Sequence, residues 1–557
     1  CFPSKFAVTN KKCYLRCELW IYQLIYLRLK KRYKRIIGKK LGYIMSKRIN
    51  QRKAGVILSY IQTVAGALIG LIYVPLLVYF LGKNEYGLYQ LMGSILVYLG
   101  LFDFGLSNTV TRYYSKYLSL NDSKSQENLL ALSTVLYMIL GFALLIFGSI
   151  LYFYLEDIFG ASLTESEIST AKTMYIIILI SAFLTISTAV FNSIITAHER
   201  FIFLRGLSIV QILIRPVLVL AVFLIEASAL MVVIVQAAIN IFGMALKIYY
   251  SFAKLKVNIK FHFWDKPLLK EMVRYSFFIF LTAVMDQIFW RSDQIVLGII
   301  VGTASVAIYS VGTQLVIYYM NLSTAMSGVF LPHITKRVTR NASDDEITGI
   351  FIKVGRLQYI LLAAVLTGFI LFGKEFISLW VGEEFSAAYY ITLMIMIPFT
   401  VDLIQNIGLA VLQAKNMYSF RAVLFAIMAI LKIAVSIPLA YFYGGIGAAF
   451  ATGISYLIGN GLVMNIYYYK KARLNIFVFW KEILKLSVPV VIVFAIGTLI
   501  SHISFEPVMI SFLLKLLLFV ICYIVFLWKL GLNEYEKELI SGLLKKVFKI
   551  KQVRSQL

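Results

Sequence analysis

Long apolar segments separated by short polar links repeat along nearly the whole chain. About fourteen segments are near 20 residues, the length at which an α-helix spans roughly 30 Å of hydrocarbon. Their centres lie near Ala67, Val97, Ile139, Leu184, Leu218, Ile239, Phe289, Tyr318, Leu362, Phe399, Ile430, Tyr456, Phe494 and Val520. The links near Glu226 and Gly444 are the least distinct divisions. The pattern predicts an all-α polytopic membrane protein with about 14 transmembrane helices.

Composition supports the same class. The chain has 557 residues, of which 60% are hydrophobic and 15% charged, and its mean hydropathy is +0.83. Soluble domains average roughly 45–50% apolar and about 25% charged residues. The sequence has no Walker loop, H-E-x-x-H or G-x-S-x-G motif, and its loops are too short for a catalytic domain. We therefore expect a transporter without catalytic residues, cofactor or metal site, rather than a membrane-embedded enzyme.

The distribution of charge predicts the topology. Basic residues gather in alternate links, as in "KRVTR", "KKARL" and the tail "KKVFKIKQVR", whereas "YLEDIFGASLTESE" and "GEEF" mark the opposite set. By the positive-inside rule, both termini are cytoplasmic. The net charge of +27 then indicates contact with anionic membrane lipids, and no nucleic-acid partner is expected.

Residues 1–44 differ from the rest of the chain. They contain "LRLKKRYKRIIGKK" and are followed by "MSKRINQRKAG", which looks like an ordinary protein start. We expect an upstream N-terminal extension or, if the segment is native, a basic amphipathic strip on the inner leaflet.

Two parts of the chain about 220 residues apart share a pattern. Gly82 aligns with Gly302, Tyr89 with Tyr309 and Lys116 with Lys336. Such a repeat predicts two six-helix lobes, residues 45–260 and 261–475, related by a pseudo-two-fold axis along the membrane normal. Residues 476–557 add two helices and a basic cytoplasmic tail. A substrate path between the lobes, used by alternating access, is expected from this arrangement.

The stretch "MDQIFWRSDQIVLG", Met285 to Gly298, places three charges inside the predicted seventh span. Each charge near the centre of a lipid-facing helix costs about 2.5–3.5 kcal/mol. Helical spacing puts its polar residues on two stripes: Gln287, Arg291, Gln294 and Gly298 on one, Asp286 and Asp293 on the other. We expect one half of this helix to face water.

Other spans contribute cations to the same expected cavity. Arg215 and Lys432 lie inside spans, and Arg112 lies just past the second span, at the cavity mouth or as a cytoplasmic anchor. Together with Arg291 they would hold an anion, because the guanidinium fork donates two hydrogen bonds and keeps its charge when desolvated.

The carboxylates expected in the cavity are Asp103, Asp286, Asp293 and Asp402. They could take H⁺ or Na⁺ and couple substrate movement to an ion gradient. Alternatively, the charges inside the spans form salt bridges between helices. Arg356 and Lys247, near span ends, are expected to extend toward the membrane surface.

Four stretches resemble bacterial polysaccharide flippases of the Wzx type, in the polysaccharide transport branch of the multidrug/oligosaccharidyl-lipid/polysaccharide exporter superfamily. They are "LGKNEYGLYQL", "GLFDFGLSNTVTRYYSKY", "RSDQIVLGIIVGTASVAIYSVG" and "GGIGAAFATGISYLI". The resemblance covers the chain from about Met45 onward. It implies a V-shaped pair of lobes and binding roles for Arg291 first, then Asp103 and Arg112.

The same resemblance implies a function in the bacterial cytoplasmic membrane. Such proteins move undecaprenyl-pyrophosphate-linked oligosaccharide from the inner to the outer leaflet for O-antigen or other surface polysaccharide, beside polysaccharide polymerase and assembly proteins. The two added helices resemble those of the related lipid II flippases, but the uncharged first-span core, Ala54 to Phe80, departs from that group. The alternative is an ion-coupled multidrug or small-solute antiporter on the same fold.

Overall fold

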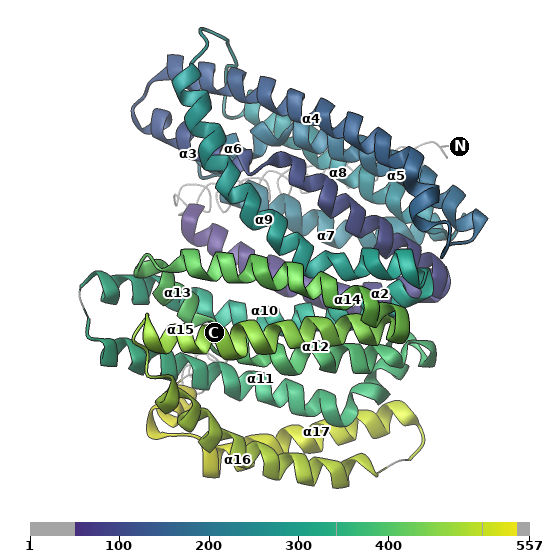
Figure 1. Ribbon diagram of the computed structural model, residues 1–557, viewed down its shortest axis with the longest axis vertical. Helices are drawn as coiled ribbons and strands as arrows, with labels where there is room; N and C mark the ends of the chain where they lie inside the picture. Colours follow the sequence, from purple (N-terminus) through teal and green to yellow (C-terminus); the bar gives the residue numbers. More distant parts are fainter. Residues whose placement is uncertain (1–50, 341, 504, 543–557) are drawn as a thin grey trace, which may run out of the picture. The chain divides into compact units, whose positions relative to one another are not determined.

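The structure, a computed structural model, describes residues 51–340, 342–503 and 505–542. The described residues from Ser59 onward form one compact unit. The expected N-terminal extension at 1–44 lies outside the described residues. Every regular element in the described ranges is a helix (Figure 1).

The first half of the chain contains eight helical elements. They are α2 (Gln51–Leu99), η1 (Gly100–Asp103), α3 (Leu106–Ser119), α4 (Ser123–Phe159), α5 (Glu165–Ser187), α6 (Ala189–Ala197), α7 (Phe201–Phe223) and α8 (Ala229–Ala253). The second half begins with α9 (Lys266–Ile300), α10 (Thr303–Thr339), α11 (Asp344–Val381) and η2 (Glu383–Phe385). It continues with α12 (Ala387–Ile404), α13 (Ile407–Ala414), α14 (Tyr418–Tyr456), the π-helix η3 (Leu457–Val463), α15 (Met464–Lys470), α16 (Ile476–Ser501), α17 (Val508–Phe526) and η4 (Leu527–Gly531).

The number of spans agrees with the sequence prediction. Within the described residues, eleven helices are long and apolar enough to cross a membrane. Two of them are broken by a glycine with positive φ, Gly82 (φ 71°) and Gly444 (φ 57°), so each continues as two spans. The more polar α10 has 37 residues and is also long enough. The indistinct link near Gly444 is thus a kink, whereas the chain leaves the helix near Glu226, between α7 and α8.

Gly82 and Gly302, paired by the repeat, adopt similar backbone conformations. Their φ and ψ angles are 71° and −179° at Gly82, and 107° and 178° at Gly302. This combination is accessible to glycine and strained for other residues. The shared geometry agrees with a duplicated unit, and the lobe boundaries at residues 44, 260 and 475 stay predictions.

The polar links start the helices that follow them. Asp122, Ser228, Asp265, Ser343 and Asn475 each accept a hydrogen bond from a backbone N–H in the first turn of the next helix. Thr164 and Glu167 form a complete capping box at the start of α5. These caps satisfy N–H groups that have no partner within the helix, and each contributes about 1 kcal/mol.

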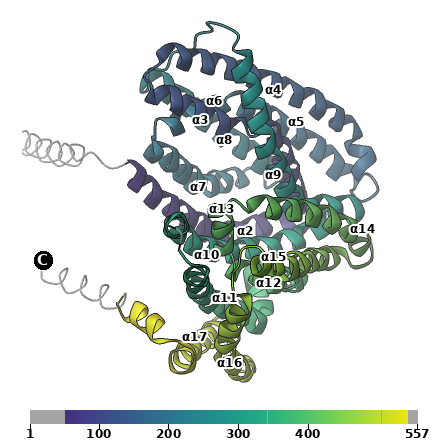
Figure 2. The ribbon, with the colours of Figure 1, turned by 60° about the vertical axis from the view of Figure 1, so that its left-hand side comes forward.

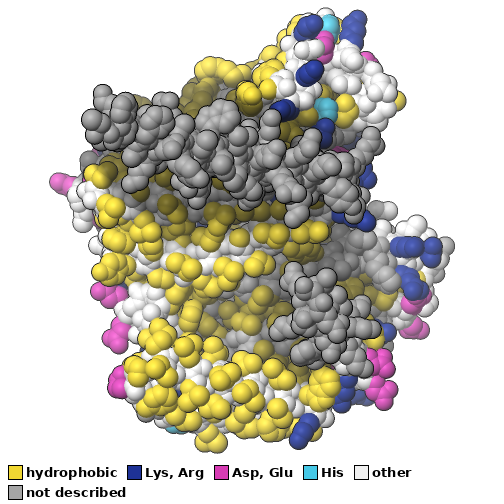
Figure 3. All heavy atoms as spheres, turned by 180° about the vertical axis from the view of Figure 1, so that it is seen from behind, with side chains coloured by type: hydrophobic (Ala, Val, Ile, Leu, Met, Phe, Trp, Pro, Cys, Tyr) yellow, Lys and Arg dark blue, Asp and Glu magenta, His cyan; other side chains and the backbone are white. Residues whose placement is uncertain are grey.

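The surface of the bundle is apolar over a wide area. Figure 3 shows hydrophobic side chains across the middle of one face, with charged side chains toward its margins. Leu224 and Tyr79 are 88% and 82% exposed. In a membrane such side chains face lipid, whereas contiguous apolar patches of this extent are rare on soluble monomers. The chain is therefore a multi-span membrane protein.

The helices α16 and α17 pack together and against α11 (Figures 1 and 2). An apolar cluster that includes Phe372, Leu486 and Phe519 fills their interface. Lys515 of α17 also forms an ion pair with Glu375 of α11, with an N–O distance of 3.0 Å. The two added helices are thus attached to the preceding bundle by apolar packing and by charge.

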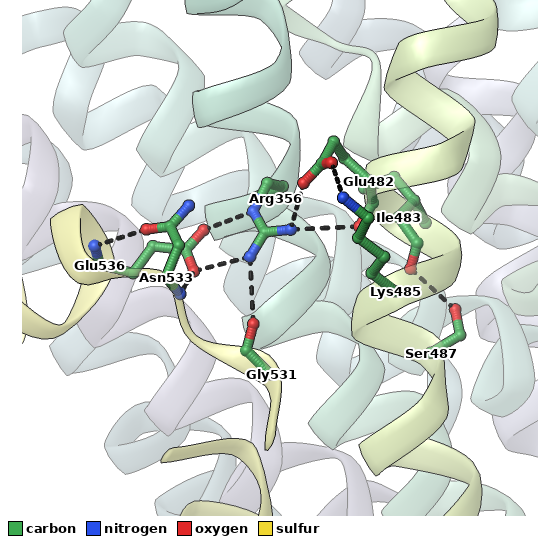
Figure 4. Close-up of polar contacts among 8 residues, drawn as sticks. All are labelled: Arg356, Glu482, Ile483, Lys485, Ser487, Gly531, Asn533 and Glu536. Carbon is green, nitrogen blue, oxygen red and sulfur yellow. Dashed lines mark hydrogen bonds and ion pairs between the residues drawn. The ribbon is translucent and has the colours of Figure 1, made fainter. Parts of the chain in front are cut away.

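Arg356 provides a second attachment, and its expected position at the membrane surface is wrong. The side chain projects from α11, is 4% exposed, and contacts α16 and the segment after η4 (Figure 4). Its Nε and Nη2 donate to the two carboxylate oxygens of Glu536 at 2.7 and 2.9 Å. Its Nη1 donates to Glu482 Oε2 at 3.0 Å, and Nη2 also donates to the Gly531 carbonyl at 3.1 Å. The guanidinium fork thereby joins three segments that are far apart in sequence.

We expect Arg356→Met to destabilise this attachment strongly. Glu536 is 1% exposed, and removal of one partner of a buried ion pair costs about 3–5 kcal/mol. Lys485→Met is the control, because Lys485 is 60% exposed and a surface pair contributes only about 0–1 kcal/mol. Thermal unfolding of the purified variants measures both effects. Equal melting temperatures for the two variants would contradict the role assigned to Arg356.

Candidate functional site

Helix α9 contacts helices from both halves of the chain. Its first half packs on α3, where the hydroxyls of Thr109 and Ser276 lie 2.6 Å apart. Just before α3, the ring of Phe104 stacks on Phe280 of α9 at 4.3 Å. Its second half packs on α14 and α10. The charged stretch 285–298 therefore lies where the N-terminal helices (α2–α8) meet the C-terminal helices (α10–α17).

Arg291 is a partly buried cation at this junction. Its Nη1 donates to Gln294 Oε1 at 3.3 Å, and Gln294 in turn donates to Ser310 Oγ at 3.0 Å. Nearby, the Tyr98 hydroxyl of α2 donates to the Gln287 carbonyl at 3.4 Å. Among the described residues, no carboxylate lies within 4.0 Å of the Arg291 guanidinium. Arg291 therefore has hydrogen bonds but no countercharge in this conformation.

Asp293, two residues further on, is fully buried and paired. Lys432 of α14 lies 2.8 Å from its carboxylate, and the two side chains are 0% and 1% exposed. Ser436 and Thr452 donate to the carboxylate at 2.8 and 2.9 Å, and Tyr309 also donates to it. Here the structure agrees with the alternative of a salt bridge between helices, because both charges are buried against each other.

Asp402 also has a basic partner. Arg421 Nη2 lies 3.4 Å from its carboxylate, and Arg421 Nη1 donates to Asn460 within the π-helix η3. Arg421 was missed in the sequence because it lies near the start of a span, where arginine is ordinary. Nothing in the linear pattern indicated that it would turn toward Asp402.

Three predicted residues have no ion-pair partner among the described residues. Asp286 is exposed, and its nearest hydrogen-bond donor is the Gln287 amide at 3.3 Å. Arg112 lies over the ring of Tyr275 of α9, 4.7 Å from its centroid. Arg215 of α7 has a buried Nε without a hydrogen-bond partner. The structure thus leaves Arg112, Arg215 and Arg291 as unneutralised cations.

Asp103 lies at a separate cavity within the N-terminal helices. Its carboxylate accepts from Ser107 at 2.8 Å, and the hydroxyls of Ser107 and Tyr137 lie 3.0 Å apart. Lys247 lines the same cavity. The expectation that Lys247 extends toward the membrane surface stays a prediction.

The two sets of helices also meet closely at the α9–α10 turn. Ser162 Oγ donates to the Gly298 carbonyl at 2.5 Å, and Thr303 Oγ1 donates to Glu167 at 2.6 Å. Gly87 faces the Thr303 backbone so closely that a Cβ there would overlap the carbonyl oxygen. Small side chains thus allow direct backbone contact, and this end of the junction is closed.

The bundle of long apolar helices, with the unpaired Arg291 where its two sets of helices meet, has the fold of a membrane transporter. A lipid II flippase, MurJ, in an inward closed conformation has a TM-score of 0.68 at 17% identity, over 85% of this chain and 97% of that one. An inward-facing multidrug transporter of the MATE family, in the MOP superfamily, has a TM-score of 0.59 at 12% identity, over 75% and 99%. At these identities the comparison establishes the fold alone.

The chain belongs to the polysaccharide biosynthesis protein family, whose profile matches residues 53–338, more than half of the chain. This confirms the resemblance drawn from the sequence motifs. A curated relative, the probable low-salt glycan biosynthesis flippase Agl15 of Haloferax volcanii, is 21% identical over 223 residues. That match spans 40% of this chain and 46%, about half, of the relative.

We expect Lys432→Met to destabilise the protein and Asp293→Asn/Lys432→Met to restore much of the loss. The single variant leaves a buried carboxylate without its cation, which costs about 3–5 kcal/mol, whereas the double variant removes both charges. Thermal unfolding and membrane yield measure the effect. If Lys432→Met is as stable as the wild type yet inactive in export, Lys432 serves the substrate rather than the fold.

Proposed function

We propose that this protein moves undecaprenyl-pyrophosphate-linked oligosaccharide units from the inner to the outer leaflet of the bacterial cytoplasmic membrane, for surface polysaccharide biosynthesis. The observation that carries the proposal is the unpaired Arg291 guanidinium at the junction of the two helical sets. Family membership and the flippase name of the Haloferax volcanii relative support the same substrate class.

An arginine without a countercharge in a membrane bundle suits a diphosphate ligand. The guanidinium keeps its charge at any physiological pH, and its fork matches two phosphate oxygens. In water-free surroundings the unpaired charge is costly, so an anionic substrate group stabilises the site when it enters. Arg112 and Arg215 are proposed as further contacts for the anion. Lys432 is not proposed as a contact in this conformation, because Asp293 already neutralises it.

The carboxylates, like the cations, fall into two groups: those with an ion-pair partner and those without one. Asp293 and Asp402 face Lys432 and Arg421, whereas Asp103 and Asp286 have no ion-pair partner among the described residues. If H⁺ or Na⁺ drives the cycle, Asp286 is the carboxylate free to take the ion, whereas Asp103 shares a separate cavity with the cation Lys247. We propose this coupling as part of the mechanism.

In an alternating-access cycle, the closed contact at the α9–α10 turn would act as the outer gate. The charge pattern predicts that the α4–α5 and α9–α10 turns face away from the cytoplasm. Closure there, through Gly87, Ser162 and Thr303, would leave substrate access from the cytoplasmic side. Separation of these contacts would then release the oligosaccharide to the outer face.

A second candidate is an ion-coupled multidrug or small-solute antiporter. The MATE-family fold favours it, as does the exposed Asp286 near an aromatic cluster in which Trp290 and Phe399 lie 5.5 Å apart. Such a site would accept an organic cation. A binding site for organic cations does not account for the unpaired Arg291, so we place the antiporter second.

Cells that lack the protein provide the test. Labelled lipid-linked oligosaccharide should accumulate complete and inward-facing, protected from a membrane-impermeant glycosidase, while surface polysaccharide is lost. If the labelled unit reaches the outer face normally in these cells, the flippase proposal is wrong and the antiporter takes its place.

We expect Arg291→Ala to reduce export by about ten- to hundredfold, as expected when one charged hydrogen-bonding contact is lost. Insertion should be unaffected or improved, because a costly intramembrane charge is removed. Arg205→Ala is the matched control, since Arg205 is an exposed arginine that donates a 3.4 Å hydrogen bond to Gln62. Surface polysaccharide and membrane yield are measured together. Wild-type export by Arg291→Ala would refute its assignment.

We expect Gly87→Ala to impair export, because the new Cβ prevents the backbone contact with Thr303. Gly66→Ala on the same helix is the control, since open space surrounds Gly66. Accessibility of a cysteine placed at Ser162 to an impermeant thiol reagent measures whether this end opens. Equal labelling in the two backgrounds would show that Gly87 does not control closure.

A further inference from the structure

The N-terminal helices border a partly open cavity that the proposed anion site does not use; its wall is largely apolar and carries several polar side chains. Its volume is about 460 Å³, within the roughly 300–1,000 Å³ of small-molecule pockets. Its lining comes from α2, η1, α3, α5, α6 and α8, and includes no residue of α9. A narrower space of about 40 Å³, bordered by Tyr89 and Gln236, shares Ser181 and Asn240 with it.

Several polar groups in the cavity have no protein partner. The side chains of Asn192, Asn240 and Lys247 make no hydrogen bond or ion pair within the part of the chain that the structure describes. Asp103 and Lys247 both line the cavity without forming an ion pair with each other. Two amides and an ammonium without a protein partner, and a carboxylate that accepts from Ser107 through one oxygen, are therefore available to a ligand.

This combination excludes the simpler occupants. A cation would be repelled by Lys247, and an anion by Asp103. A lipid tail would leave both charges and both amides without partners in an apolar environment, which is costly. A neutral ligand with many hydroxyls satisfies all four groups, because a hydroxyl both donates and accepts.

We propose that this cavity is a saccharide subsite that holds one sugar residue of the transported glycan. Asn192 and Asn240 would bind neighbouring hydroxyls through amide N–H and C=O groups, while Asp103 accepts and Lys247 donates. Ile186 and Met244 supply apolar wall for the carbon face of the ring. The proposal rests on the proposed function and adds where part of the glycan is recognised, apart from the diphosphate contact at Arg291.

The test uses the full-length protein purified in detergent. The probe is the oligosaccharide released by mild acid from lipid-linked units of the same cells, which lacks the lipid and diphosphate. Its binding is measured by calorimetry. Asn240→Leu and Lys247→Met should each weaken binding by about tenfold or more, as expected for a lost hydrogen-bonding contact. Lys254→Met, at the end of the same helix and outside the cavity lining, is the control and should bind as the wild type.

A second variant, Thr185→Leu, tests the subsite independently of any effect that replacing Asn240 or Lys247 has on folding. Thr185 lines the cavity but donates only to the Ser181 carbonyl of its own helix, at 2.7 Å. Thr185→Leu should therefore narrow the cavity with the fold intact, as verified by size-exclusion elution, and should weaken binding too. Unchanged affinity in Thr185→Leu and Asn240→Leu, or no binding to the wild type, would overturn the subsite. So would stabilisation by Na⁺ that disappears in Asp103→Asn, because the cavity would then be a cation site.

The outcomes separate the two proposals. If cells lacking the protein accumulate inward-facing glycan but Asn240→Leu and Thr185→Leu restore normal export and binding, the subsite fails and the flippase function stands. If those cells flip the lipid-linked unit normally, the flippase function fails. A glycan that still binds in the cavity would then be a ligand of another process.

Discussion

The central constraint on this molecule is that an ionised side chain inside an apolar bundle needs a partner. The carboxylate of Asp293 meets this requirement completely. It is ion-paired and hydrogen-bonded to the side chains of Lys432, Ser436, Thr452 and Tyr309. These partners come from α10 and from both sides of the kink in α14, and they fix α9 against them. The position of Arg291, one helical half-turn away on α9, follows from that packing.

The same constraint separates structural charges from available ones. Asp402 with Arg421, and Arg356 with Glu536, are satisfied within the bundle and stabilise contacts between helices. Arg291 lies at the junction without a countercharge, and Asp103 shares a cavity with an ammonium it does not reach. Charges of the first kind hold the bundle together, and those of the second kind remain for ligands.

The sequence predicted what depends on local properties. Apolar length predicted the spans, and the repeat paired Gly82 with Gly302, which share an unusual backbone conformation. It could not predict partners, because these depend on which faces of distant helices meet. Position near a span end predicted that Arg356 extends toward the membrane surface, and this was wrong because Glu482 and Glu536, far away in sequence, bury its guanidinium. Lys432 likewise looked like a free cation until α14 was placed beside α9.

The positions of the two proposed contacts have a mechanical consequence. The anion contact is on α9, which packs on both helical sets, whereas the saccharide subsite lies wholly within the N-terminal helices. A glycan bound at both would connect these helices to α9 through the ligand itself, in addition to the α3 contacts. Its binding would then favour conformations in which the two contacts are correctly spaced, and would disfavour the others. A substrate that lacks either the diphosphate or the recognised sugar would bind one part only and exert no such bias. Selectivity for the complete lipid-linked unit would thus arise from the spacing of two modest sites rather than from one tight site.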